Sequence, residues 1–108
     1  MNKSALLTAH GLIHGDRQHA YGHPLDDFAK TAAMWTARLR GRGLLAPGVE
    51  LQPEDVAWMM VDVKWSRECN GHGDDNLIDA AGYIGTLDLI HQERQRRASA
   101  AGGTTPCV

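Results

Sequence analysis

Two aspartates four residues apart, Asp75 and Asp79, stand in a segment whose other residues are mostly apolar or small. On a helix this interval places both carboxylates on one face, about one turn apart. Carboxylates arranged in this way can jointly hold a divalent cation. Leu77, Ile78 and Ala81 form a neighbouring apolar stripe, so we expect this helix to pack against partner helices with its acids at the edge of the buried face.

The segment before this helix supplies further acids, and antiparallel packing would bring some of them close to Asp75 and Asp79. Carboxylate oxygens suit Mg²⁺ or Mn²⁺, which also bind substrate phosphates. Glu54 and Asp55 follow Pro53 at a helix start, where acids also complement the helix dipole without any catalytic use. Asp79 lies inside its helix, where an unpaired charge is costly. The sequence leaves open whether Asp79 binds a metal or ligand or forms a structural salt bridge.

Basic residues offer partners for these acids or for an anionic ligand. Lys64 and Arg67 are three apart on one predicted helix, so they could neutralise the acids or bind a phosphate. The turn-rich segment 15–24 adds Arg17 as another anion donor, Tyr21 as a stacking or hydrogen-bonding group, and His23 next to them. The alternative for this segment is an ordinary structured surface turn.

Histidines and tryptophans allow two further uses. The pairs His10/His14 and His19/His23 have the interval of a zinc site on a helix, but the first has no obvious third ligand and the second spans a predicted loop. The three tryptophans are expected to fill the core or a subunit interface. The alternative for one of them is stacking on a nucleobase.

The apolar spacing predicts the elements that must position these side chains. Helices are expected over residues 4–13, 26–40, 53–68 and 75–97, with a loop at 15–24 and a connector at 44–52. No stretch of useful length alternates as a strand does. The expected fold is therefore all-α, a small bundle of about four helices, in a single domain over residues 1–98 with a disordered tail at 99–108.

The composition narrows the class of protein. The chain has 108 residues, 43% hydrophobic and 22% charged, with a net charge of −2, and this balance gives no basic field for nucleic acid. It contains no apolar run long enough for a membrane span, so no membrane partner and a cytoplasmic location are expected. A domain of this size has little surplus stability, which favours an oligomer.

Several separated motifs resemble a family of small phage and prophage proteins without an assigned function. They are Gly-Asp-Arg-Gln at 15–18, Tyr-Gly-His-Pro at 21–24, Pro-Glu-Asp-Val-Ala at 53–57, the Lys64 and Arg67 pair, and the segment 75–83 with its two aspartates and Ala-Gly-Tyr. The resemblance covers roughly residues 12–90. The resemblance indicates which proteins are related to this chain, but it does not indicate an activity.

The segment 75–83 is also similar to the later acidic helix of MazG-like all-α nucleoside triphosphate pyrophosphohydrolases. Asn76 stands where that family has a second acid, and the segment 58–67 offers only Asp62 where the family has a pair of glutamates. This resemblance implies a homodimer or homotetramer with a pocket between helices. It implies Asp62, Asp75 and Asp79 as catalytic metal ligands for Mg²⁺, or Mn²⁺. Lys64, Arg67 and Arg17 would then bind phosphate, with Tyr21 and His23 completing the substrate site.

Three functions follow as hypotheses. The first is Mg²⁺-dependent hydrolysis of a nucleoside triphosphate between its α and β phosphorus atoms, which releases pyrophosphate. The second is a phage module that binds and sequesters a nucleotide or a nucleotide-derived signal without turning it over. The third is a structural or interaction bundle whose Asp, Lys and Arg side chains form a buried ionic network.

Overall fold

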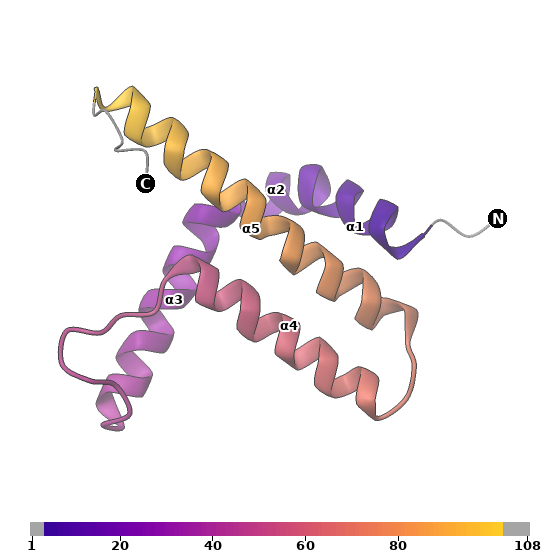
Figure 1. Cartoon of the computed structure of the whole chain (residues 1–108), viewed down its shortest axis with the longest axis horizontal. Coiled ribbons are helices and arrows are strands. Elements are labelled where there is room, and N and C mark those ends of the chain that lie inside the picture. Colours follow the sequence, from indigo (N-terminus) through magenta and orange to yellow (C-terminus); the bar gives the residue numbers. More distant parts are fainter. Residues whose placement is uncertain (1–3, 103–108) are drawn as a thin grey trace.

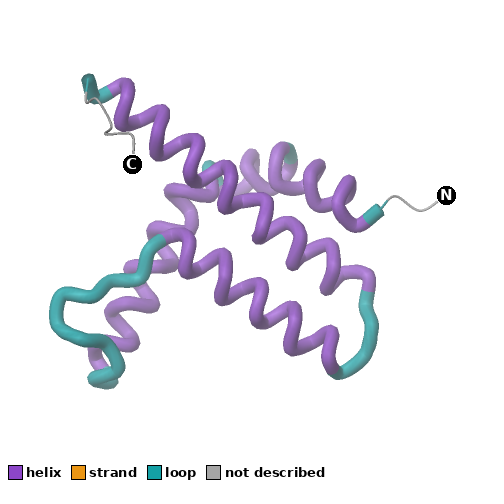
Figure 2. Tube along the Cα trace, in the orientation of Figure 1, coloured by secondary structure: helices purple, strands orange, loops and turns teal. Residues whose placement is uncertain are grey.

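The computed structural model describes residues 4–102 of the chain, which form five helices (Figure 1). They are α1 (Ala5–His14), α2 (Asp16–Tyr21), α3 (Pro24–Gly41), α4 (Pro53–Cys69) and α5 (Asp74–Ala100). The described residues contain no strand, so the expected all-α class is confirmed (Figure 2). The expected number of about four helices is one too low, because part of the predicted loop at 15–24 is helix α2.

Local signals explain where the helices begin. The Ser4 Oγ atom accepts a hydrogen bond from the Leu7 amide at 3.2 Å and so caps α1. At the start of α4 the side chains of Gln52 and Asp55 form a capping box, in which Asp55 Oδ2 accepts from the Gln52 amide at 2.8 Å. Asp55 therefore has the helix-capping use that the sequence allowed for it.

The α4–α5 hairpin is the centre of the fold, and α1 lies along α5 while α3 crosses behind the pair (Figure 1). Two glycines of α5 permit the close approach of α1. A Cβ atom on Gly85 would stand 2.6 Å from Ile13 Cδ1, and one on Gly82 would stand 3.6 Å from Ile13 Cγ2. At the other end of the hairpin Arg94 Nη2 donates to Glu54 Oε1 at 2.8 Å, which fixes the start of α4 against α5. This contact lowers the pKa of Glu54, chiefly through the hydrogen bond from Arg94.

The buried core of the described chain is small. Its buried apolar residues are Ala9, Ile13, Ala32, Val56, Ala57 and Ile90, and Ile90 is the one large side chain among them that is fully buried. Trp58 and Trp65 are 52% and 72% exposed, so these two tryptophans do not fill the core of the single chain. Of the two uses predicted for the tryptophans, the core of a single chain therefore does not apply to Trp58 and Trp65, and a subunit interface stays a prediction.

The chain beyond the core shows two further features. Helix α5 continues to Ala100, so the first two residues of the predicted tail at 99–108 are helical. Residues 101–102 form a turn, and residues 103–108 lie outside the described part. Among the helices that the structure describes, none has both the length and the apolar character needed to cross a membrane.

Candidate ligand-binding site

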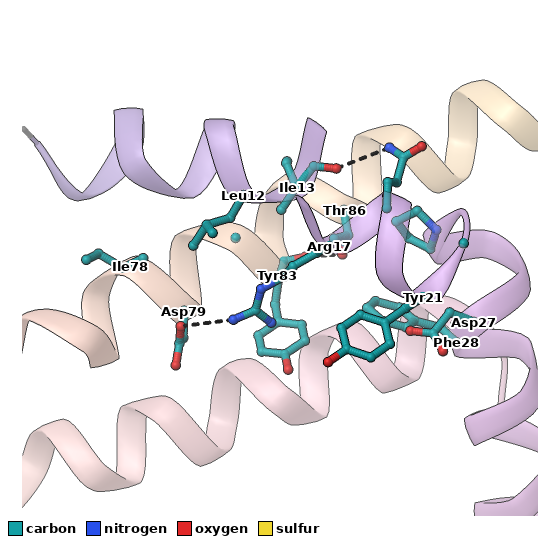
Figure 3. A pocket seen from close by; sticks show the side chains of 14 residues that line it. Leu12, Ile13, Arg17, Tyr21, Asp27, Phe28, Ile78, Asp79, Tyr83 and Thr86 are labelled. Carbon is teal, nitrogen blue, oxygen red and sulfur yellow. Dashed lines mark hydrogen bonds and ion pairs between the residues drawn. The ribbon is translucent and has the colours of Figure 1, made fainter. Parts of the chain in front are cut away.

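A cavity of about 380 Å³ opens between α1, α2, the start of α3 and the middle of α5 (Figure 3). Its volume falls within the range of small-molecule sites in proteins. The polar or charged side chains at its wall include Arg17, Gln18, Asp27 and Asp79. The rest of the wall is mostly apolar or aromatic and includes Leu12, Ile13, Tyr21, Pro24, Phe28, Ile78 and Tyr83.

The short helix α2 carries the outer part of this wall. Gln18 Nε2 donates to the Ile13 carbonyl at 3.1 Å and ties α2 back to α1 (Figure 3). Gly22 follows with φ +82°, a left-handed conformation that favours glycine and turns the chain into α3. Tyr21, 64% exposed, is thereby held at the mouth of the cavity.

Asp79 is ion-paired at the cavity wall. Lys64 Nζ lies 3.1 Å from one carboxylate oxygen, and Arg17 Nη2 lies 3.8 Å from the other. The Lys64 side chain is 13% exposed and that of Asp79 is 23% exposed, whereas Arg17 is 49% exposed. Of the two uses that the sequence left open for Asp79, the salt bridge to Lys64 is present. The longer contact leaves Arg17 as a cation at the edge of the cavity.

The three aspartates predicted as metal ligands are not brought together in one chain. Asp62 and Asp75 are exposed. No group of three His, Cys, Asp or Glu side chains suited to a metal occurs among the side chains that the structure describes. The register of α4 gives the reason, because Lys64 faces Asp79 and Asp62 is rotated from Lys64 by about 200°. The histidine pairs considered for zinc belong to no such group among the described side chains either. The rings of His10 and His14 stack on each other with centroids 4.1 Å apart.

The predicted substrate residues divide into two groups. Arg17 and Tyr21 line the cavity, and Lys64 reaches its edge through Asp79. Arg67 is exposed on α4 and does not line the cavity.

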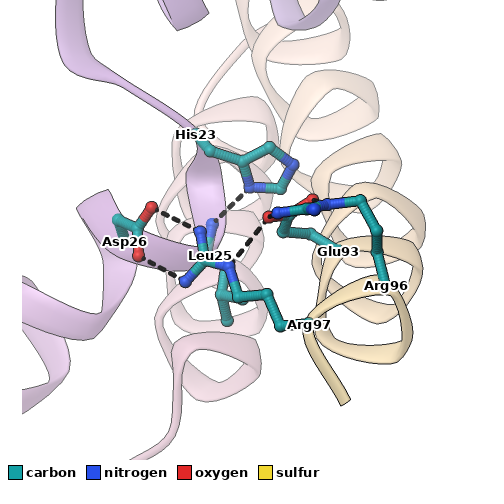
Figure 4. A network of polar contacts seen from close by, with 6 residues as sticks. All are labelled: His23, Leu25, Asp26, Glu93, Arg96 and Arg97. Atoms are coloured by element: carbon teal, nitrogen blue, oxygen red, sulfur yellow. Dashed lines mark hydrogen bonds and ion pairs between the residues drawn. The ribbon is translucent and has the colours of Figure 1, made fainter. Parts of the chain in front are cut away.

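His23 serves the start of α3, where its Nδ1 atom accepts a hydrogen bond from the Leu25 amide at 3.0 Å (Figure 4). The same view shows Arg97 of α5 donating to Asp26 at 2.7 and 2.8 Å and to Glu93 at 2.8 Å, which holds α5 against the first turn of α3. The hydrogen bonds from Arg96 and Arg97 lower the pKa of Glu93 to about 2.

Two aromatic residues of the cavity were not assigned a binding role from the sequence. The rings of Phe28 and Tyr83 have centroids 6.1 Å apart and tilt by 37°. Phe28 is half-buried on α3, and its side chain lines the cavity. Tyr83 follows Asp79 by four residues, so the helix interval itself places both on one face and could have identified it.

A second polar cluster lies at the turn between α4 and α5. His72 Nδ1 is 2.6 Å from Glu68 Oε2, and His72 Nε2 is 3.1 Å from Asp74 Oδ1. Glu68 Oε1 also accepts hydrogen bonds from the Gly73 amide and the Asn76 side chain. These contacts, first of all that with His72, lower the pKa of Glu68 to about 2, and the contact with Glu68 raises the pKa of His72.

The cavity and its ionic wall define a small helical protein with a site of ligand size, and its relatives are phage proteins. Residues 4–92 match the family described as "Domain of unknown function (DUF6378)", and the chain belongs to this family. The chain is similar to the "Gene 55 protein" of Mycobacterium phage L5, with 37% identity over 95 residues, which cover 87% of this chain and 56% of the relative. The "Gene 55 protein" of Mycobacterium phage D29 is 34% identical over 94 residues, which cover 86% and 57%.

The chain thus spans a little over half the length of these phage relatives. No solved structure matches it. The predicted membership of a phage protein family without an assigned function is confirmed, whereas the resemblance to MazG-like enzymes stays a prediction.

Proposed function

We propose that this chain is a binding module that captures a nucleotide or a nucleotide-derived small molecule in the cavity between α1, α2, α3 and α5. The observation that carries the proposal is the composition of the cavity wall, in which aromatic rings lie beside an arginine that has one long ionic contact. A ligand with a planar base and an anionic group needs both kinds of partner.

The aromatic side supports recognition of a flat ring. Tyr21, Phe28 and Tyr83 all line the cavity, so it offers aromatic rings to a ligand. Stacking of a base on an aromatic side chain contributes about 1–3 kcal/mol and tolerates different bases. The cavity is therefore suited to the base and sugar, with the phosphate at the edge where Arg17 stands.

The ionic side supports binding of an anion. Arg17 is half exposed and 3.8 Å from Asp79, so a phosphate can recruit its guanidinium with little loss. Lys64 keeps its shorter contact with Asp79. It therefore balances the negative charge of that carboxylate while Arg17 turns to the ligand. The arrangement needs no metal ion.

Hydrolysis of a nucleoside triphosphate is the second candidate. Asp75 and Asp79 stand one turn apart on α5, and Asp79 borders the cavity, which favours this reaction. Against it, Asp79 is already paired with two cations, Lys64 and Arg17. Because Asp79 is neutralised by Lys64 and Arg17, binding without turnover is the better-supported function.

The test is thermal unfolding of the chain with a panel of ribo- and deoxynucleoside mono- and triphosphates, with and without Mg²⁺. A ligand at a hundred times its dissociation constant stabilises the folded state by about 2.7 kcal/mol. For a domain of this size the melting temperature should rise by about 10 °C or more. Recovery of the ligand by anion-exchange chromatography then shows whether it is intact.

Arg17→Gln should abolish most of the rise, and Arg38→Gln, which changes an exposed arginine outside the cavity wall, should leave it unchanged. Release of pyrophosphate and a nucleoside monophosphate, lost in Asp79→Ala, would instead establish the hydrolase. If no nucleotide in the panel stabilises folded protein, the binding proposal is wrong.

A further inference from the structure

Helices α4 and α5 each carry a pair of large apolar side chains that the rest of the described chain leaves exposed. On α4 these are Trp58 and Trp65, which are 52% and 72% exposed, and on α5 they are Leu77 and Ile84, which are 46% and 47% exposed. Each pair is seven residues apart, so its two members lie on the same side of their helix. We call these four residues the hairpin face.

Both pairs point away from the helices that cover the hairpin. Val56 of α4 is 3% exposed, and Trp58 is rotated from it by about 200°. Gly82 of α5 approaches Ile13 of α1, and Ile84 is rotated from Gly82 by the same angle. In Figure 1 the helices α1, α2 and α3 lie behind α4 and α5, which agrees with a hairpin that is covered on one side.

The molecule is more extended and exposes more surface than a compact monomer of the same mass, which supports an interface that a partner would cover. Its radius of gyration is 16.0 Å, whereas a compact chain of 108 residues has about 13 Å. The chain exposes 7692 Å², and a compact monomer of 11.8 kDa exposes about 5,900 Å². A standard interface takes about 800 Å² from each partner.

We infer that the hairpin face binds a second copy of this chain, so that α4 and α5 of two protomers share one four-helix core. A two-fold contact presents the same residues from both sides, and two tryptophans with two aliphatic residues form a self-complementary apolar patch. Aromatic side chains are enriched at the energetic centre of such interfaces. The ligand cavity is built by α1, α2 and α3 behind α5, so the dimer does not depend on the proposed function.

Sedimentation velocity at about 100 µM, which is a hundred times a micromolar dissociation constant, should give twice the mass of 11.8 kDa. The double variant Trp65→Lys/Ile84→Lys should sediment as a monomer, with the helical circular dichroism of the parent. The control Leu6→Lys/Met34→Lys changes side chains that are 72% and 63% exposed on α1 and α3, and it should remain a dimer.

Tryptophan fluorescence of the unaltered chain provides a measurement that does not depend on any variant. Dilution should shift the emission to longer wavelength, because Trp58 and Trp65 become exposed to water when the dimer separates. A monomer at about 100 µM with no change on dilution would overturn the inference. A dimer that the hairpin-face variant leaves intact would also overturn it, because another surface would then hold the copies together.

Discussion

At the scale of single residues, the pairing of Asp79 distinguishes its two cationic neighbours. Lys64 is mostly buried and 3.1 Å away, whereas Arg17 is half exposed and 3.8 Å away. An exposed ion pair contributes about 0.2–1 kcal/mol, and removing one member of a buried pair costs more because the other charge is left without a partner.

We therefore expect Asp79→Asn and Lys64→Met each to lower the free energy of unfolding by about 1–3 kcal/mol. A double-mutant cycle should give a coupling of about 1 kcal/mol or more for Asp79 with Lys64 and under about 0.5 kcal/mol for Asp79 with Arg17. Urea unfolding measures both values. Equal coupling to the two cations would contradict the structural difference between them.

The sequence identified Asp79 as a residue that needs a partner, but it could not place Asp62. Asp79 was expected to need a partner because its neighbours are apolar, and Lys64 was one of the two cations considered for it. Asp62 could not be placed, because a rotation of about 100° per residue makes its direction depend on the register between α4 and α5. That register is fixed by contacts such as Glu54 with Arg94 and Glu68 with Asn76, which lie far apart in the sequence.

At the scale of elements, the turn between α4 and α5 contains a charge-dependent contact. The pKa of His72 is raised above its usual 6.5, so its contact stabilises the fold below pH 6.5 and is lost as pH rises through the raised value. The pKa of Glu68 is lowered from 4.5 to about 2, so its contact is present above pH 4.5 and is lost as pH falls toward 2. Both contributions coexist between about pH 4.5 and 6.5.

The variant His72→Gln should therefore lower the melting temperature most within this window. The difference from the parent protein should shrink at pH 9 and again near pH 2. Melting curves recorded across the range measure it, and His19→Gln, which changes an exposed histidine on α2, serves as the control. A difference that grew above pH 8 would show that His72 acts in its neutral form.

Elements with a long apolar period were predictable, and a short one was not. Helices α3, α4 and α5 each begin within two residues of the position that the sequence indicated. Helix α2 has six residues between Gly15 and Gly22, which is too short for a visible period. Its packing beside α1 and the hydrogen bond from Gln18 to Ile13 stabilise it, and neither contact is visible in the local sequence.

At the scale of the whole molecule, the dimer that we propose would make the stability of this small core depend on association. A protein that is stabilised by a partner subunit melts at a temperature that rises with its concentration. We expect the melting temperature of this chain to rise over a hundredfold increase in concentration, and to stay constant for Trp65→Lys/Ile84→Lys. Scanning calorimetry at several concentrations tests this. A constant value for the parent would contradict a shared core.

The all-α class and the helix order were predictable because apolar spacing is a local property of the chain. The cavity was not, since Arg17, Phe28 and Tyr83 come from three different helices and meet through packing. The sequence also left open whether the tryptophans fill the core or a subunit interface, because aromatic residues are typical of both, and only the structure shows that Trp58 and Trp65 are exposed in a single chain.

The central position of α5 also sets an order of events during synthesis. This helix supplies Asp79 and Tyr83 to the cavity, the close contact to α1 through Gly85, and the ionic contacts from Arg94 and Arg97 to α4 and α3. It follows all of those elements in the chain, and domains form as the ribosome releases them from the N-terminal side. Helices α1 to α4 therefore leave the ribosome with their inner faces uncovered, and the cavity comes into existence only when α5 has emerged.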